Sequence, residues 1–154
     1  MSDPVYFHGT DRVFERFDSA RLHSHEDRHA NGMLGVWAAC SPDLAARFGD
    51  TVLVVRPRRN RVHEFDISDL SRLAREGALS EEGAVEHHRR FAERHRGEYD
   101  VLAIRESSGS IDMVVLLDPE EIEILARVPS AAIDRMPSIL EELGLAATGT
   151  TPHP

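Results

Sequence analysis

The stretch Gly35–Phe48, G-V-W-A-A-C-S-P-D-L-A-A-R-F, carries the strongest fold signal in the chain. Its apolar first half predicts a strand. Ser41 then supplies a helix N-cap, and Pro42 suits the first helical position because it needs no N–H partner there. The pattern predicts a strand, a tight turn and a short helix that ends at Gly49.

Apolar and β-branched runs on either side of this unit predict further strands, at 5–7, 51–56, 61–65, 99–104, 113–117 and 122–128. The first is expected to break into a turn at His8-Gly9-Thr10. The second and third, joined by the basic turn Arg56–Arg61, are expected to be neighbours. Helical periodicity covers 67–97, where a second helix should begin at Ser80 and end at Gly97, and a terminal helix is expected over 131–143.

These elements predict an α+β fold with most of its β structure in short antiparallel strands. The length of 154 residues fits one domain, which we place at 1–145, followed by a flexible tail at 146–154. A hydrophobic content of 41% is typical of a globular chain and excludes wholesale disorder.

The chain carries 27 acidic and 18 basic residues, a net charge of −9, and every basic residue is arginine. This balance disfavours wholesale binding to nucleic acids or anionic membranes, although a local basic patch stays possible. The lone Cys40 cannot form an internal disulfide, and neither a signal peptide nor a long apolar run is evident. We therefore expect a cytoplasmic protein.

His8-Gly9 at a strand end is the first candidate for a ligand site. A histidine can donate from one ring nitrogen and accept at the other, and a following glycine lets backbone groups approach a ligand. A plain turn is the commoner explanation of such a pair. Trp37 and Phe48 form a second candidate, because a strand-turn-helix could place their rings on two sides of a flat ligand. From spacing alone, burial of both rings in the core is favoured.

Asp112 is the third candidate, at the start of a strand after the flexible stretch 107–110. A solvated strand-end residue is the commoner role for such an acid. A carboxylate that faces a cleft could instead stabilise a sugar cation and accept a hydrogen bond from a ribose hydroxyl.

The remaining polar groups are weaker candidates, and a structural explanation is favoured for each. No metal site is expected at the loop histidines, because no further ligands accompany them. The groups are the histidines His23, His25 and His29, the helical His87, His88 and His95, the thiol of Cys40, and the arginines of the turn Arg56–Arg61.

Taken in order along the chain, these motifs resemble the ADP-ribosyltransferase fold of the diphtheria-toxin-like class. The resemblance covers about Tyr6–Leu125 and is greatest to the small polyvalent-protein type of phages and mobile elements. It rests on the opening H-G-T, on Gly35 and Pro42 seven residues apart, on Trp37 and Phe48 eleven apart, and on the closing I-D-M-V-V-L-L-D-P.

The resemblance implies a split β-sheet core and an NAD-dependent mono-ADP-ribosyltransferase acting on a host macromolecule, as a toxin, effector or anti-defence protein. NAD would be the co-substrate. By position, His8 would hydrogen-bond a ribose of NAD, the backbone of Gly9 would hold the nicotinamide amide, and Trp37 with Phe48 would stack on the ring. Asp112 would stabilise the cation that forms as nicotinamide leaves, and Thr10 and Gly35 complete the expected cofactor-binding set.

The diphosphate of NAD must be held by backbone N–H groups and arginines, for which Arg47 and the turn Arg56–Arg61 are our candidates. The acceptor, expected to be a protein, would be selected by the loops 18–32 and 105–111. Asp112 replaces the usual glutamate, and Ser110 disfavours arginine as the acceptor. A catalytically inactive module of the same fold, binding a basic protein partner, therefore stays open as the alternative.

Overall fold

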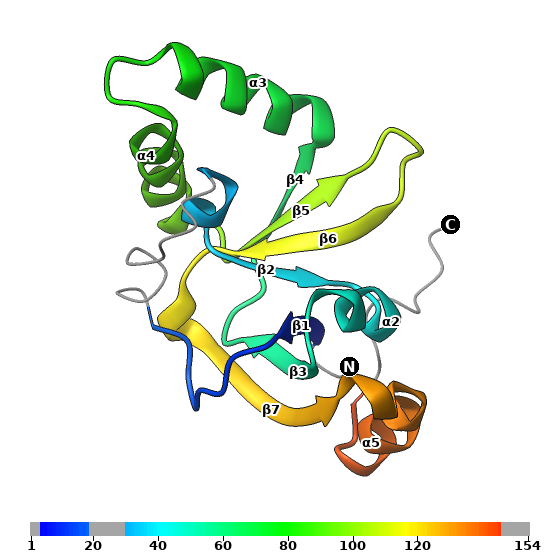
Figure 1. The fold of residues 1–154 in the computed structure, drawn as a ribbon. Helices are drawn as coiled ribbons and strands as arrows, with labels where there is room; N and C mark the ends of the chain where they lie inside the picture. Colours follow the sequence, from blue (N-terminus) through cyan, green and yellow to red (C-terminus); the bar gives the residue numbers. More distant parts are fainter. Residues whose placement is uncertain (1–3, 19–29, 146–154) are drawn as a thin grey trace.

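The computed structural model describes residues 4–18 and 30–145, and the strands form a single seven-stranded sheet in the order β4-β5-β6-β2-β1-β3-β7 (Figure 1). The chain is therefore α+β, as the sequence predicts. The strands are β1 (Tyr6–Thr10), β2 (Val36–Ala39), β3 (Thr51–Pro57), β4 (Val62–Asp66), β5 (Val101–Arg105), β6 (Ile111–Leu116) and β7 (Ile122–Pro129).

The α-helices and short 3-10 helices connect these strands at the places where the sequence carries capping signals. They are η1 (Ala30–Leu34), α2 (Pro42–Ala45), η2 (Ala46–Phe48), α3 (Ile67–Leu79), α4 (Ala84–Arg96), η3 (Pro119–Glu121), η4 (Ser130–Arg135) and α5 (Met136–Glu142). The Ser41 hydroxyl accepts a hydrogen bond from the Leu44 N–H at 3.2 Å, so the predicted N-cap of the central helix is confirmed.

Antiparallel pairing dominates the sheet, and β4 with β5 is the one parallel pair among the described strands. The prediction that 51–56 and 61–65 are neighbours is wrong. Both edges of β3 are occupied, by β1 and by β7, so the chain carries β4 to the far side of the sheet. The turn between them is tied to two separate places, because the Arg58 N–H donates to the Glu121 carbonyl and the Arg61 N–H to the Asp100 carboxylate.

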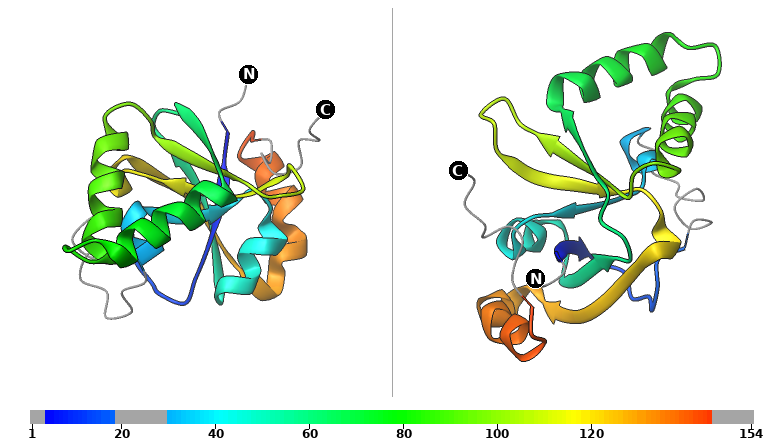
Figure 2. Two further views of the ribbon diagram at one scale, coloured as in Figure 1. Left: turned by 90° about the horizontal axis from the view of Figure 1, so that it is seen from above. Right: turned by 180° about the vertical axis from the view of Figure 1, so that it is seen from behind.

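The helices pack at two separate places along the sheet, α3 and α4 toward β4 and β5, and α2 and α5 toward β1, β3 and β7 (Figures 1 and 2). Each pair covers its own hydrophobic cluster. A third cluster consists of strand side chains and Phe17, with members from β3 and β7 as well as from β5 and β6. The sheet thus curls around this third cluster, and its middle strands β2 and β1 lie between the two helical groups.

Two predicted boundaries need correction. His8, Gly9 and Thr10 belong to β1 and do not form a turn, because they pair in register with Leu53, Val52 and Thr51 of β3. The second predicted helix begins at Ala84 instead of Ser80.

Ser80 is the C-terminal cap of α3, and Gly83 adopts a φ of +89°, which no helical residue has. Within residues 4–18 and 30–145, no helix is long and apolar enough to cross a membrane.

Candidate functional site

The sheet is weakly joined between its two middle strands, β1 and β2. Five register pairs connect β1 to β3, but a single pair, Phe7 with Ala39, connects β1 to β2. Beyond that pair, the ring of His8 replaces the backbone ladder, and its Nδ1 lies 2.7 Å from the carbonyl oxygen of Trp37. Each buried backbone carbonyl needs a donor, so this contact keeps the strands joined where their ladder stops.

This hydrogen bond fixes the chemical state of His8. Because a carbonyl oxygen only accepts, Nδ1 must carry the proton, and Nε2 of the neutral ring is then an acceptor. Burial lowers the pKa of His8, and the bond to Trp37 opposes that shift only in part. His8 is therefore neutral at pH 7 and offers a lone pair at Nε2.

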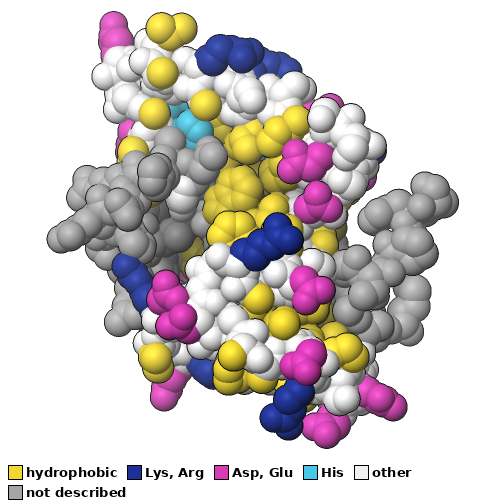
Figure 3. Space-filling model, turned by 45° about the vertical axis from the view of Figure 1, so that its right-hand side comes forward, with side chains coloured by type: hydrophobic (Ala, Val, Ile, Leu, Met, Phe, Trp, Pro, Cys, Tyr) yellow, Lys and Arg dark blue, Asp and Glu magenta, His cyan; other side chains and the backbone are white. Residues whose placement is uncertain are grey.

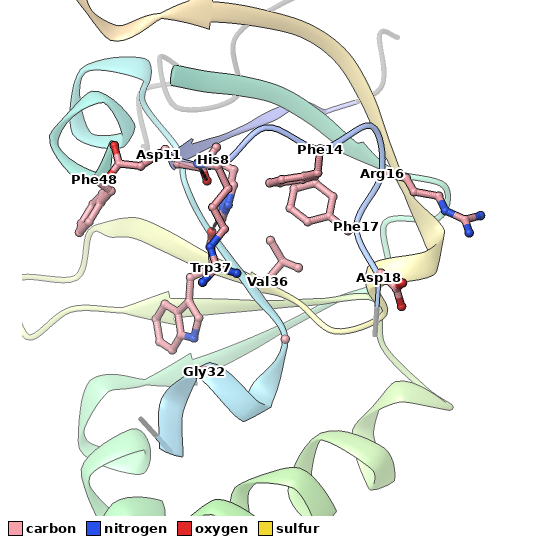
Figure 4. Close-up of a pocket in the computed structure, with 14 residues that line it drawn as sticks. His8, Asp11, Phe14, Arg16, Phe17, Asp18, Gly32, Val36, Trp37 and Phe48 are labelled. Carbon is pink, nitrogen blue, oxygen red and sulfur yellow. Dashed lines mark hydrogen bonds between the residues drawn. The ribbon is translucent and has the colours of Figure 1, made fainter. Parts of the chain in front are cut away.

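A cavity of about 400 Å³ opens at this junction (Figure 4), which is the size of a site for a small ligand or for half of a dinucleotide. Its wall comes from β1, the loop after β1, the start of β2 and the end of η2. It is lined by His8, Gly9, Thr10, Asp11, Arg12, Phe14, Arg16, Phe17, Asp18, Gly32, Gly35, Val36, Trp37 and Phe48. Six of the eight residues predicted to act in the site are among them.

Trp37 and Phe48 line the same cavity, which favours the interpretation of the pair as a ligand-binding feature. Phe48 is 57% exposed, so its ring does not belong to the hydrophobic core. Trp37 is half-buried and packs against the cluster under α3 and α4. Hydrophobic side chains also line a hollow in the molecular surface, with an arginine side chain lying across it (Figure 3).

Gly9 positions Phe48, because a Cβ at Gly9 would lie 1.9 Å from the carbonyl oxygen of Ala45 and 3.0 Å from Cβ of Phe48. The α2–η2 segment therefore packs directly on the backbone of β1. The glycine of the H-G-T motif is required for this packing, whatever ligand the cavity holds.

Gly35 and Thr10 also have structural partners at the cavity wall. Gly35 has a φ of +155°, and a Cβ there would lie 2.3 Å from the carbonyl oxygen of Leu116. The Thr10 hydroxyl accepts a hydrogen bond from the Arg12 N–H at 3.0 Å, which turns the chain out of β1. Both residues shape the wall through its backbone.

Asp112 is exposed and does not line this cavity within the described residues. Its carbonyl accepts from the Cys40 N–H at 2.9 Å, and its Oδ2 lies 3.4 Å from the Ser110 hydroxyl. Cys40 is the residue after β2 and follows Trp37 by three positions, a distance of about 10 Å in an extended chain. The predicted catalytic acid thus lies on β6, which pairs with β2, three residues before Val115, the register partner of Trp37.

Arg47 is exposed and lies outside the lining of the cavity. Three of the four arginines in the turn Arg56–Arg61 pair with carboxylates, Arg56 with Glu123, Arg58 with Glu121 and Arg61 with Asp100. The structure instead brings two other arginines to the cavity, Arg12 and Arg16. We did not predict them, and their position two and six residues after Thr10 of the H-G-T motif is the signal that could have found them.

An aromatic cluster beside His8 was also missed as a wall of the site. The ring of Phe17 packs edge-on to the ring of His8 with centroids 5.2 Å apart, and Phe14 packs on Phe17 at 4.9 Å. Phe17 is buried and joins the central cluster of the sheet. Phe17, itself supported by Phe14, therefore restricts the movement of the His8 imidazole.

The weaker candidates stay outside this site. His88 is fully buried in the α3–α4 layer and donates to the carbonyl of Ala84, and His95 stacks on Phe91. Burial and the Asp112 charge raise the pKa of the Cys40 thiol to about 11, so it is a poor nucleophile at neutral pH. The described residues contain no group of three potential metal ligands, and His23, His25 and His29 lie outside them.

No protein-family model and no curated protein matches the chain. One solved structure, titled "Crystal structure of an anti-CRISPR protein", aligns with 79% of this chain and 94% of its own length, with 14% sequence identity and a TM-score of 0.42.

Proposed function

We propose that the chain is a mono-ADP-ribosyltransferase that binds NAD in the cavity between β1 and β2 and transfers ADP-ribose to a macromolecule. The observation that carries the proposal is the convergence of His8, Trp37 and Phe48 on one cavity. They come from three different elements, and the cavity they share has both aromatic surface and a free hydrogen-bond acceptor. The opening of the sheet at this cavity also fits the split-sheet core of the ADP-ribosyltransferase fold.

Each of these groups suits one part of the co-substrate. The rings of Trp37 and Phe48 offer flat apolar faces for the nicotinamide, which is itself a flat cation and gains from aromatic contact. The Nε2 lone pair of His8 accepts from a ribose hydroxyl. The backbone of Gly9, at the cavity wall, is available to the carboxamide.

In the transfer, the bond between C1′ of the ribose and the ring nitrogen of nicotinamide breaks, and its electron pair neutralises the nicotinamide cation. The positive charge moves to the ribose, where a carboxylate stabilises it before an acceptor group attacks C1′ and loses a proton. Asp112 is our candidate for that carboxylate. The proposal requires the ribose to extend along β2 from Trp37 toward Cys40, so that it reaches the exposed carboxylate.

The test has two parts. NAD should raise the melting temperature of the protein, since a ligand at one hundred times its Kd adds about 2.7 kcal/mol to the free energy of unfolding. Incubation with NAD and a cell lysate should release nicotinamide and add the mass of one ADP-ribose to an acceptor. No NAD binding, together with no adduct in any lysate, would refute the proposal.

A second candidate is a module that binds a partner but does not catalyse transfer, and the distance of Asp112 from the cavity favours it. The Asp112→Asn variant separates the two, with Asp134→Asn on η4 as the control for loss of one exposed charge. A transferase should lose nicotinamide release only in Asp112→Asn while both variants keep NAD affinity. A protein that shows no release in any form, but co-purifies with a basic partner, is the module.

A further inference from the structure

We infer that Arg12 is the anion-binding residue of the cavity and holds a phosphate group of its ligand. The inference rests on the proposed function for the identity of the ligand, but its physical basis is independent of NAD. Among the described residues, the Arg12 guanidinium forms no hydrogen bond or ion pair, although it lines the cavity.

Arg12 combines two properties, a place in the cavity lining and no ion pair within the described residues. The chain has a net charge of −9, and seven of its described arginines pair with carboxylates, among them Arg56 with Glu123 and Arg61 with Asp100. Other described arginines without such a pair, Arg47 and Arg75 for example, lie outside the cavity lining, which contains only Arg12 and Arg16. A guanidinium left without such a partner at the wall of a cavity has its five donors available to a ligand. Phosphate oxygens match that fork of donors in geometry and in charge.

The backbone at Arg12 is fixed, which makes the residue a suitable clamp. Its N–H donates to the Thr10 hydroxyl, and Thr10 is held in β1 by pairing with Thr51. The neighbouring Asp11 accepts from the Asp50 N–H at 2.8 Å, so the two residues before Arg12 are tied to β1 and to the segment that leads into β3.

Arg16 is the alternative, but its guanidinium points away from Trp37 and His8 (Figure 4). Arg47 lies outside the cavity lining. A phosphate held by Arg12 would share the cavity with the rings of His8, Trp37 and Phe48. The ligand class is therefore a phosphorylated nucleoside or dinucleotide.

The experiment measures the affinities of ADP-ribose, pyrophosphate and nicotinamide riboside for the full chain by calorimetry. Arg12→Gln should weaken binding of ADP-ribose and pyrophosphate by about ten-fold or more, the usual effect of losing a charge-assisted hydrogen bond, and leave nicotinamide riboside unchanged. Arg75→Gln on α3 removes the same charge from an exposed helical position far along the chain and serves as the matched control. Arg47→Gln tests the assignment made from the sequence.

The outcomes separate the two proposals. If the wild-type chain binds neither ADP-ribose nor pyrophosphate, or if Arg12→Gln weakens them no more than Arg75→Gln, the inference is wrong. If pyrophosphate binds through Arg12 but NAD does not bind, the inference holds and the proposed function fails. If NAD binds equally well with Arg12→Gln, the proposed function stands without this residue.

Discussion

The Nδ1 atom of His8 lies 2.7 Å from the carbonyl oxygen of Trp37, and this contact bridges the two strands whose backbone ladder consists of one register pair. A side chain thus takes over the role of a backbone donor at the centre of the sheet. The same ring presents its other nitrogen to the cavity. Substitution of His8 would therefore disturb the joint between the strands together with any binding role that we propose for the ring, so its replacement is a poor test of function.

Trp37 offers a cleaner test of the aromatic site. Trp37→Ala should raise the Kd for NAD about ten-fold, because stacking and buried area together exceed about 1.4 kcal/mol for a ring of this size. Val13→Ala is the control, since Val13 is 96% exposed beside the cavity without lining it. Calorimetric titration measures both. Equal affinities of the two variants would remove Trp37 from the site.

The packing of η2 on β1 predicts a strong effect of a single methyl group. Gly9→Ala should lower the free energy of unfolding by at least about 1–3 kcal/mol, because the new Cβ collides with the Ala45 backbone, which cannot move freely. Gly97→Ala should be neutral or stabilising, as Gly97 has a helical φ of −71° and open space around it. Urea unfolding of the two variants measures the difference, and equal midpoints would contradict this account of Gly9.

His88 predicts how stability depends on pH. Burial lowers its pKa from 6.5, the Ala84 carbonyl opposes the shift, and the neighbouring charge of His87 adds to it. The unfolded chain then binds a proton at higher pH than the folded one. The contribution of neutral His88 to the free energy of unfolding is therefore fully present above about pH 6.5 and is lost as the pH falls through the lowered pKa.

His88→Leu should make this decline shallower, as measured by urea midpoints between pH 8 and pH 5. A residual slope is expected, since the pKa of His8 is lowered in the same direction. The variant also removes a ring nitrogen, Nε2, that is buried without a hydrogen-bond partner in the described residues. An unchanged slope would show that His88 is protonated equally in the folded and unfolded states.

Cys40 predicts a slow reaction with alkylating agents. With a thiol pKa of about 11, about one molecule in a thousand carries the thiolate at pH 8. The rate of modification by iodoacetamide should rise about ten-fold per pH unit across this range. Asp112→Asn should speed the reaction, because the Asp112 charge contributes to the raised pKa. Rapid modification of the wild-type protein at pH 7 would contradict the assigned environment.

Local signals in the sequence determined most of the secondary structure. Ser41 and Pro42 define the start of α2, β-branched residues define β3, and Gly97 ends α4. These features act within a few residues, through caps, turns and side-chain periodicity, so a single sequence displays them. The proximity of Trp37 and Phe48 is also local, because only a short helix separates β2 from η2, whereas His8 comes from a strand 25 residues earlier in the chain and lines the same cavity.

Tertiary structure alone decided the strand order and the charged part of the site. The sequence predicts that 51–56 pairs with 61–65, because hairpins are the commonest local solution, but β1 and β7 compete successfully for both edges of β3. Likewise, the motif order suggests Arg47 as an anion ligand and Asp112 as the acid of the site, but only Arg12 and Arg16 among the described arginines line the cavity, and Asp112 does not. Which residues line the cavity depends on contacts between segments that are far apart in the chain. These contacts form through the pairing and burial of the whole sheet, so no short stretch of sequence predicts them.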